Sequence, residues 1–247
     1  MTKATEALSA DRDVMLGICA GLDDAGWKAP SGCPGWSVQD LVSHMGALFW
    51  AAVDRGHLPD AGDRPTEQAG EFHVESRRHL GPAEIAADYE TVSARALDAL
   101  AGWAGLDLEV PLGDLGTYPL STLPAAYCFD HYVHIRSDLF APRGPLPGPV
   151  PESDEPRLAC ALDWIEAALP QQNAGALATL DGPVEFVITG PAARTFRSGP
   201  GTALATVTCA APEFTRAVTR RETWESAGAR LDGAPAALAA VRQLRIF

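Results

Sequence analysis

The sequence predicts an α+β protein in which a helical first half precedes a small α+β domain. Three observations support this prediction. Apolar residues in the first half recur at the spacing of α-helices. A proline-rich stretch then interrupts the chain, and the second half mixes β-branched, apolar runs with helical ones. The chain has 247 residues, 47% of them hydrophobic, which is enough for one large domain or for two modest ones.

The first two helices are predicted from their apolar stripes. One is expected from Ser9 to Ala25, because Val14, Ile18 and Leu22 fall one turn apart. The second is expected to open at Ser37, with Asp40 three residues later as in a capping box. Its stripe comprises Val38, Leu41, Val42, Met45, Leu48 and Phe49.

Two further helices complete the predicted bundle. A polar, turn-rich connection is expected from Asp54 to about Glu71. The third helix should start at Gly81-Pro82, since proline suits the first turn, and run to about Trp103. The fourth is expected from about Ser121 to Phe140. Four helices with one long connection indicate an antiparallel bundle.

The domain boundary is predicted from the segment APRGPLPGPVPESDEP, which covers residues 141–156. Its six prolines and two glycines cannot sustain a helix or a central strand. We therefore expect a helical bundle over residues 1–145, a proline-rich linker over 146–156 and a small α+β domain over 157–247.

In the second half, helices and strands are expected to mix. The expected helices are Arg157 to Leu169, about Pro212 to Arg221, and a final one that carries Leu238, Val241 and Leu244. The expected strands are Val184 to Ile188, Ala203 to Cys209, and a short one around Ala227 to Leu231.

Composition and charge exclude several classes of partner. The formal net charge of −13 has the wrong sign for a protein that neutralises nucleic-acid phosphates or binds an anionic membrane surface. The chain shows neither a signal peptide nor an apolar run long enough to span a bilayer. Five scattered cysteines without a CxxC pair argue against disulfides and a zinc ribbon, so we expect a reducing cytoplasm. Abundant Ala, Arg, Gly and Pro, which have GC-rich codons, indicate a high-GC bacterial source.

Candidate metal ligands lie on two of the predicted helices. His44 flanks the apolar stripe of the second helix, and Asp130 and His134 share a face of the fourth at i,i+4 spacing. Two structural alternatives to a metal site explain the same pattern. His44 can be a core histidine, and Asp130 and His134 can form a simple hydrogen bond on the helix face. His131 is an alternative to Asp130, because it lies three residues before His134. Two imidazoles and a carboxylate suit zinc or another divalent transition metal and leave a position open. Cys33 is expected to be a buried structural thiol.

Trp27 and the segment PSGCPGWSVQDLVSH, which runs from Pro30 to His44, resemble the N-terminal signature of the mycothiol-dependent maleylpyruvate isomerase family. The segment from Ala205 to Thr208, the helix after it, Arg221 and the last helix are similar to the C-terminal domain that often follows. The resemblance implies a DinB-like four-helix metal-binding domain and a sterol-carrier-like α+β domain, in an actinobacterial protein.

The resemblance also implies a site. Family members place a histidine where His44 stands and an acid and a histidine where Asp130 and His134 stand; the acid is usually glutamate, a methylene longer than Asp130. The family's metal activates the thiol of mycothiol, and an arginine at the position of Arg221 handles a substrate carboxylate. Tyr127, one turn before Asp130, is the candidate hydrogen-bond donor.

These features lead to one preferred function and two alternatives. The preferred function is a metal-dependent isomerase or thiol transferase that acts on a small carboxylated electrophile through a metal-activated, mycothiol-like thiol. The first alternative is a metal-dependent biosynthetic enzyme that does not use mycothiol. The second is a non-catalytic protein that binds a small ligand.

Overall fold

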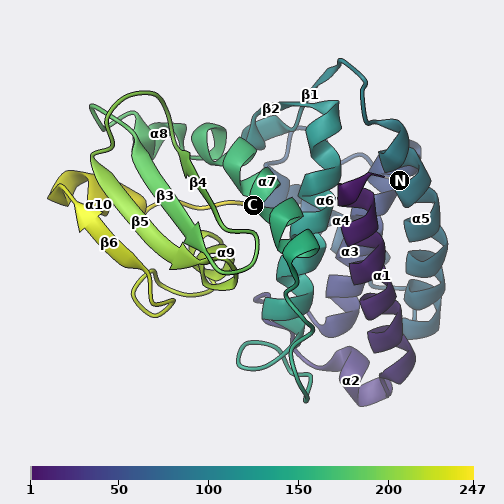
Figure 1. The fold of residues 1–247 in the computed structure, drawn as a ribbon. Helices are drawn as coiled ribbons and strands as arrows, with labels where there is room; N and C mark the ends of the chain where they lie inside the picture. The colour runs from purple at the N-terminus through teal and green to yellow at the C-terminus, as the bar shows by residue number, and fades with distance from the viewer. Residues whose placement is uncertain (1) are drawn as a thin grey trace. The chain divides into compact units, whose positions relative to one another are not determined.

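The computed structural model describes residues 2–247 (Figure 1), and the chain divides into two compact units, Met1–Glu152 and Ser153–Phe247. The division falls inside the range 146–156, where prolines are frequent. A helical unit followed by a small sheet unit confirms the predicted α+β class. None of the helices over residues 2–247 is long and apolar enough to cross a membrane.

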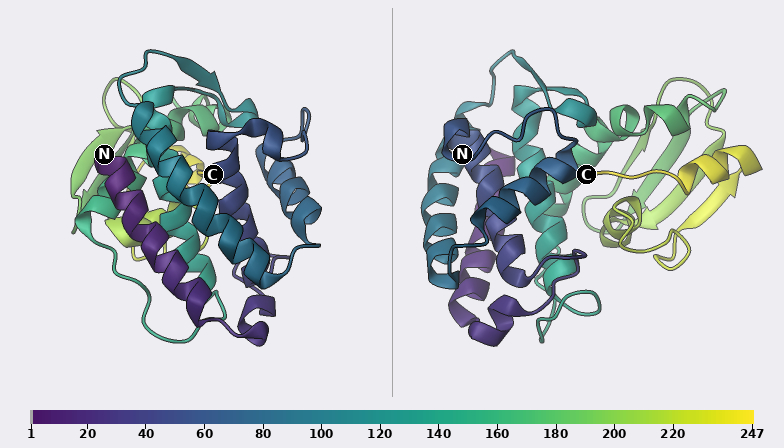
Figure 2. Two further views of the ribbon diagram at one scale, coloured as in Figure 1. Left: turned by 90° about the vertical axis from the view of Figure 1, so that its right-hand side faces the viewer. Right: turned by 180° about the vertical axis from the view of Figure 1, so that it is seen from behind.

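The first unit is built on four long helical segments that pack against one another (Figure 2). The segment over residues 38–53 packs extensively on the one over 82–102, and the segment over 3–21 contacts those over 82–102 and 123–133. Its core contains the fully buried side chains of Leu8, Met15, Leu41, Met45, Ile85 and Leu100. The segments are α1 (Lys3–Gly21), α5 (Pro82–Gly102), α3 (Val38–Val53) and α6 (Leu123–Val133).

Helix α1 begins six residues before the expected Ser9, because Thr2 caps it. The Thr2 and Thr5 side chains form a reciprocal capping box that satisfies backbone groups at the start of the helix. The chain then breaks at Leu22 and starts α2 (Asp24–Lys28), which Asp23 caps. Apolar spacing alone does not reveal such a cap, so the predicted boundary was wrong at the N-terminal end.

The polar connection from Asp54 to Glu71 is only partly a loop. It contains a short 3₁₀ turn and the first residues of α4 (Thr66–Arg77), which packs on α3. Only Val74 and Arg77 of α4 are buried, and Arg77 donates to Ser43 and to Asp88. A helix held mainly by polar contacts lacks the apolar stripe that the prediction required. A second unpredicted feature is the hairpin of β1 (Glu109–Pro111) and β2 (Thr117–Pro119).

Helix α6 does not continue to Phe140 as a regular α-helix. Residues His134–Leu139 form a π-helical turn, a wider turn that is often found at functional sites. Arg136 in this turn makes a buried bidentate ion pair with Asp11 of α1, at 2.8 and 3.0 Å, and also donates to the carbonyl of Glu152. These contacts fix the turn against α1.

The second unit contains a four-stranded sheet in the order β4-β3-β5-β6. The central pair, β3 and β5, is parallel, and each edge strand is antiparallel to its neighbour. Alternate residues of both central strands are buried, which gives the sheet one core face. The strands are β3 (Val184–Thr189), β4 (Arg194–Arg197), β5 (Ala205–Ala210) and β6 (Arg230–Gly233).

Helices complete the second unit. Helix α9 packs on β3, β5 and α7, and places Phe214 against Phe186 and Trp224. Strand β4 was not predicted, because two of its four residues are arginines and only Phe196 is buried. Strand β6 lies three residues later than expected at its start. The helices are α7 (Glu155–Gln172), α8 (Ala174–Leu177), α9 (Ala211–Val218) and α10 (Pro235–Val241).

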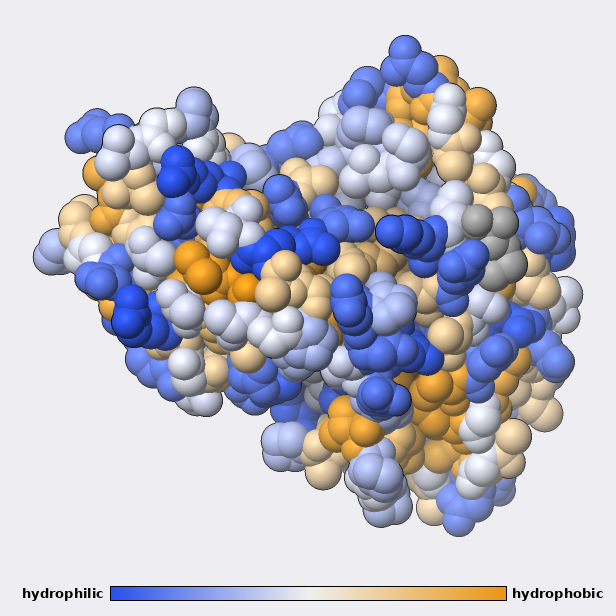
Figure 3. Space-filling view, in the orientation of Figure 1, coloured by the Kyte–Doolittle hydropathy of each residue, from blue (hydrophilic) through white to orange (hydrophobic). Residues whose placement is uncertain are grey.

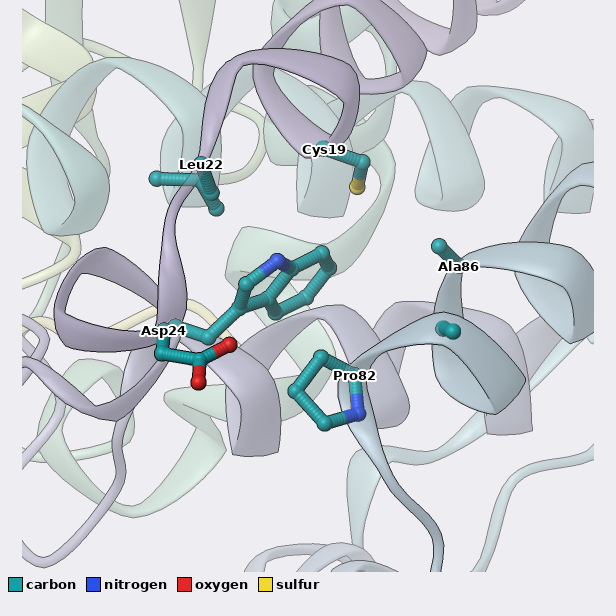
Figure 4. A pocket seen from close by; sticks show the side chains of 7 residues that line it. Cys19, Leu22, Asp24, Pro82 and Ala86 are labelled. Atoms are coloured by element: carbon teal, nitrogen blue, oxygen red, sulfur yellow. The ribbon is translucent and has the colours of Figure 1, made fainter.

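Hydrophobic residues on the face in Figure 3 form patches between hydrophilic ones. In the first unit, a hollow of about 340 Å³ lies between α1, α2 and the start of α5 (Figure 4). It is lined by Cys19, Leu22, Asp24, Trp27, Pro82, Ala83 and Ala86. None of the predicted site residues lines it, and burial raises the pKa of the Cys19 thiol to about 12.

Candidate metal centre

His44 is positioned by the start of α3. The Ser37 side chain accepts from the backbone N–H of Asp40, and the Asp40 carboxylate accepts from that of Ser37, so the predicted capping box is present. This capping box fixes the start of α3 two turns before His44. The Trp36 ring lies 4.9 Å from the imidazole, and a Cβ at Gly70 of α4 would lie 3.7 Å from it. Helix α4, absent from the prediction, therefore approaches His44 with a residue that has no side chain.

Asp130 and His134 meet His44 at the end of α6. The distance from Asp130 Oδ1 is 3.4 Å to His44 Nε2 and 3.3 Å to His134 Nε2. The two imidazoles stand nearly perpendicular, with centroids 5.3 Å apart. One ligand atom from each residue lies within 4.8 Å of the others. Ligands about 2.0–2.1 Å from a tetrahedral zinc ion lie roughly 3.3 Å apart, which these distances match.

The second oxygen of Asp130 tests whether the residues fit a metal. Oδ2 is buried and has no hydrogen-bond partner among residues 2–247. A buried carboxylate oxygen without a partner costs free energy, and bound cations commonly satisfy such atoms. The donor set of two imidazoles and one carboxylate is that of a catalytic zinc site with an open position. The residues present therefore fit a divalent transition metal.

Asp130 and His134 shift each other's pKa in opposite directions. Burial would raise the pKa of Asp130, but His134 and then His44 outweigh it and hold that pKa well below its usual range. Burial would likewise lower the pKa of His134, but Asp130, followed by Asp138 and Cys33, raises it well above the usual value. In the metal-free protein, a proton on His134 balances the Asp130 charge that a cation would otherwise balance.

His131, the alternative to Asp130, points into the core. Its Nδ1 lies 3.0 Å from the Tyr127 carbonyl oxygen and its Nε2 3.1 Å from the Tyr89 hydroxyl. Because a carbonyl only accepts, Nδ1 carries the proton and Nε2 accepts from Tyr89. The side chain is fully buried, and burial lowers its pKa. Both ring nitrogens are thus engaged, which favours Asp130 as the third ligand.

Asp138 is a site residue that the sequence analysis missed. It lies one turn after His134, is fully buried, and accepts from His134 Nδ1 at 2.8 Å. A carboxylate on the far nitrogen of a ligand histidine fixes its orientation and makes it a better ligand. Asp130, His134 and Asp138 follow one another at i,i+4 spacing, and this repeat was the available signal.

Cys33 also reaches this cluster and is half-buried, so the expectation that its thiol is buried was wrong. Its Sγ lies 3.4 Å from Asp138 Oδ2 and 3.7 Å from His134 Nδ1. It also lines a hollow of about 490 Å³ around the loop that leads into α3. Sγ therefore combines access from the hollow with contact to the cluster.

Tyr127 packs beside the cluster. Its ring lies parallel to Phe49 at 6.1 Å and edge-on to Trp103 at 6.3 Å. Burial raises the pKa of its phenol. The hydroxyl has no hydrogen bond within residues 2–247 that would hold it away from a ligand.

Arg221 belongs to the second unit. It follows α9, and its backbone N–H donates to the carbonyl of Arg216 at 2.9 Å. Its neighbour Arg220 has a positive φ of 56° and donates to the carbonyl of Gln243. These contacts anchor the turn that carries Arg221.

Comparisons with known proteins agree with this architecture. No curated protein matches the sequence. The fold is similar to the crystal structure of the mycothiol-dependent maleylpyruvate isomerase, with a TM-score of 0.59, 16% identity and coverage of 90% of this chain and 91% of that chain. A mutant of that enzyme gives a TM-score of 0.58 with the same identity and coverage. The family model of the mycothiol maleylpyruvate isomerase N-terminal domain matches residues 8–139, more than half of the chain. The chain therefore belongs to the mycothiol maleylpyruvate isomerase family.

Proposed function

We propose that this protein is a divalent-metal-dependent enzyme of the maleylpyruvate isomerase type that uses a mycothiol-like thiol. The metal, zinc by donor set, is held by His44, Asp130 and His134. One observation carries the proposal: two imidazole nitrogens and a carboxylate oxygen converge within 4.8 Å, and the other oxygen of that carboxylate is buried without a partner. The reaction is isomerisation or thiol transfer on a small carboxylated electrophile.

The bound ion would stabilise the thiolate form of the cofactor thiol at neutral pH, which is the nucleophile this chemistry needs. The residues of the chain supply the remaining functions. Asp130 balances positive charge at the site, and Asp138 keeps the proton of His134 on Nδ1 so that Nε2 faces the centre. His131 is neutral and fully buried, and its Nδ1 lies 3.7 Å from Asp130 Oδ2.

Two residues are assigned to the substrate. The Arg221 guanidinium can bind a carboxylate through two parallel hydrogen bonds, which would orient an anionic substrate. The Tyr127 phenol stays protonated at neutral pH because burial raises its pKa, so it is assigned as a hydrogen-bond donor. The five free cysteines suit a reducing cytoplasm, and the charge of −13 suits a small-molecule substrate better than a nucleic acid.

Metal content tests the centre. We expect one zinc per chain by elemental analysis, a strong loss of zinc in His44→Ala and His134→Ala, and no loss in His79→Ala. His79 is an exposed histidine of the same unit and serves as the matched control. Purified protein that takes up no stoichiometric divalent metal would overturn the proposal.

Turnover tests the chemistry. The zinc-loaded protein should isomerise maleylpyruvate only when mycothiol is present. Arg221→Lys should raise KM more than it lowers kcat, because lysine keeps the positive charge but cannot bind a carboxylate through two parallel hydrogen bonds. Asp130, shorter than the family's usual glutamate, favours one further candidate, a metal-dependent reaction without mycothiol. Turnover that is independent of a thiol would support that candidate.

A further inference from the structure

A second set of ligand atoms lies on the opposite side of His134. Cys33 Sγ, Asp138 Oδ2 and His134 Nδ1 lie within 4.8 Å of one another, as the His44 set does around Nε2. The sulfur lies 3.7 Å from Nδ1 and 3.4 Å from Oδ2. Zinc–sulfur and zinc–nitrogen bonds of about 2.3 and 2.0–2.1 Å put tetrahedral ligands roughly 3.3–3.6 Å apart. Only the Nδ1–Oδ2 pair, at 2.8 Å, is shorter, because a hydrogen bond closes it.

The loop that carries Cys33 is held rigidly against Asp138. Gly32 donates its backbone N–H to the Asp138 carbonyl at 2.7 Å, and Pro30 and Ser37 form an isolated β-bridge across the loop. A Cβ at Gly32 would lie 2.8 Å from Asp138 Cα, so only glycine permits this approach. The thiol is therefore placed beside the carboxylate before any ion binds.

Asp138 is oriented by its surroundings. Arg143 Nε lies 3.5 Å from Oδ1, and Arg143 also donates to the Gly32 carbonyl at 2.7 Å. The arginine thus compensates one oxygen and leaves Oδ2 directed at Cys33 and His134. An entry path exists, since Cys33 lines the hollow of about 490 Å³.

We propose that Cys33, His134 Nδ1 and Asp138 form a second cation site, selective for thiophilic ions, that cannot be filled at the same time as the His44 site. The thiolate gives this set a softer donor than the oxygen and nitrogen donors around Nε2. Exclusivity follows from the imidazole, because its neutral form offers one lone pair and one N–H. The exclusivity rests on the proposed function; the second site itself does not.

Proton balance is complete in either state. With an ion at Nε2, Nδ1–H donates to Asp138. When an ion binds the metal-free protein at Nδ1, the Cys33 S–H proton and the Nδ1 proton of the His134 imidazolium are released to solvent as the metal–sulfur and metal–nitrogen bonds form, and Nε2–H stays, 3.3 Å from Asp130 Oδ1. Asp130 and Asp138 thereby exchange the roles of ligand and hydrogen-bond acceptor.

Titration of the metal-free full-length protein with Cd²⁺ tests the second site through the ultraviolet charge-transfer absorption of a cadmium–thiolate bond. We expect one equivalent of signal in the wild type, in His44→Ala and in Cys19→Ser, which removes another thiol of the same unit. Cys33→Ser and Cys33→Ala should both lose the signal, and Asp138→Asn should weaken Cd²⁺ binding by about tenfold or more. Circular dichroism verifies that each variant is folded.

Signal that survives in both folded Cys33 variants would overturn the proposal, as would absence of signal in the wild type. Loss of signal in His44→Ala would show that the thiol belongs to the His44 site and would also overturn it. Exclusivity is tested on protein loaded with one zinc. Cd²⁺ binding at Cys33 should release that zinc to a chromogenic chelator, whereas retention of both ions would contradict exclusivity. Protein that binds Cd²⁺ at Cys33 but never binds zinc would refute the proposed function alone.

Discussion

Asp130 and Asp138 lie one turn before and one turn after the same histidine, yet their surroundings differ. Asp130 contacts His44 and His134 through Oδ1, while its buried Oδ2 lacks a hydrogen-bond partner within residues 2–247. Asp138 accepts from His134 and Cys33 and faces Arg143. A carboxylate with an unsatisfied oxygen is suited to bind an ion, and one whose oxygens are satisfied is suited to orient a neighbour. Hydrogen bonding, more than spacing, separates the two roles.

The largest expected effect is on Asp130. Asp130→Asn keeps the shape but removes the charge from the three-ligand set, so we expect zinc affinity to fall by more than about 100-fold, beyond the range for residues that only orient ligands. Zinc affinity by competition with a chelator is the measurement. A loss smaller than that of Asp138→Asn would reverse the assigned roles.

Asp138→Asn is expected to have the next largest effect. It weakens the orientation of His134 without removing a ligand, so zinc affinity should fall by about 10- to 100-fold. The same chelator competition measures it, with His79→Ala as the unaffected control. Unchanged affinity in this variant would show that the His134–Asp138 hydrogen bond plays no part in holding the ion.

Gly32→Ala should destabilise the loop that joins Cys33 to Asp138. The new Cβ would lie 2.8 Å from Asp138 Cα, and overpacking of this kind costs typically 1–3 kcal/mol. Chemical denaturation compares the free energy of unfolding with that of Gly17→Ala in α1. Gly17 has nothing within 4 Å of an added Cβ, so that change should be neutral or stabilising.

The pH dependence of the metal-free protein follows from the opposed pKa shifts. The depressed pKa of Asp130 stabilises the folded protein at pH values above about 3.9, the pKa of an aspartate in the unfolded chain. This stabilisation is lost as the pH falls towards the folded pKa. The raised pKa of His134 adds stability that is fully present below about 6.5 and is lost as the pH rises through the folded pKa. The pair should therefore contribute most between about pH 4 and 6.5.

Thermal unfolding of the metal-free protein at pH 6 and at pH 9 measures this contribution. The melting temperature should fall more across that interval in the wild type than in Asp130→Asn, which lacks the main partner of His134. Equal falls in both proteins would show that the pair does not couple as described.

Arg143→Ala should have the smallest effect. The guanidinium is about one-third exposed and its contact with Asp138 is 3.5 Å, so the ion pair should contribute at most about 1 kcal/mol to stability. Chemical denaturation in low and high salt measures it. A loss well above that value would show that Arg143 is essential for holding Asp138.

The sequence was most informative where helical periodicity determines position. His44, Asp130 and His134 were identified because a turn of helix relates side chains on one face. Asp138 continues the same spacing but was missed, because its role depends on two features without a periodic pattern. One is the π-helical turn, and the other is the close approach of the Gly32 backbone to Asp138. Helix α4 and strand β4 were missed because each buries few apolar residues, so neither carries a periodic pattern.

X-ray absorption at the zinc edge, on protein loaded with one zinc and no added thiol, tests the assigned roles of the two carboxylates most directly. If Asp130 is the ligand and Asp138 orients His134, the spectrum should show only nitrogen and oxygen neighbours, at about 2.0–2.1 Å, with the multiple-scattering pattern of two imidazoles. A sulfur neighbour at about 2.3 Å would place zinc beside Cys33 and Asp138 and would contradict the assignment.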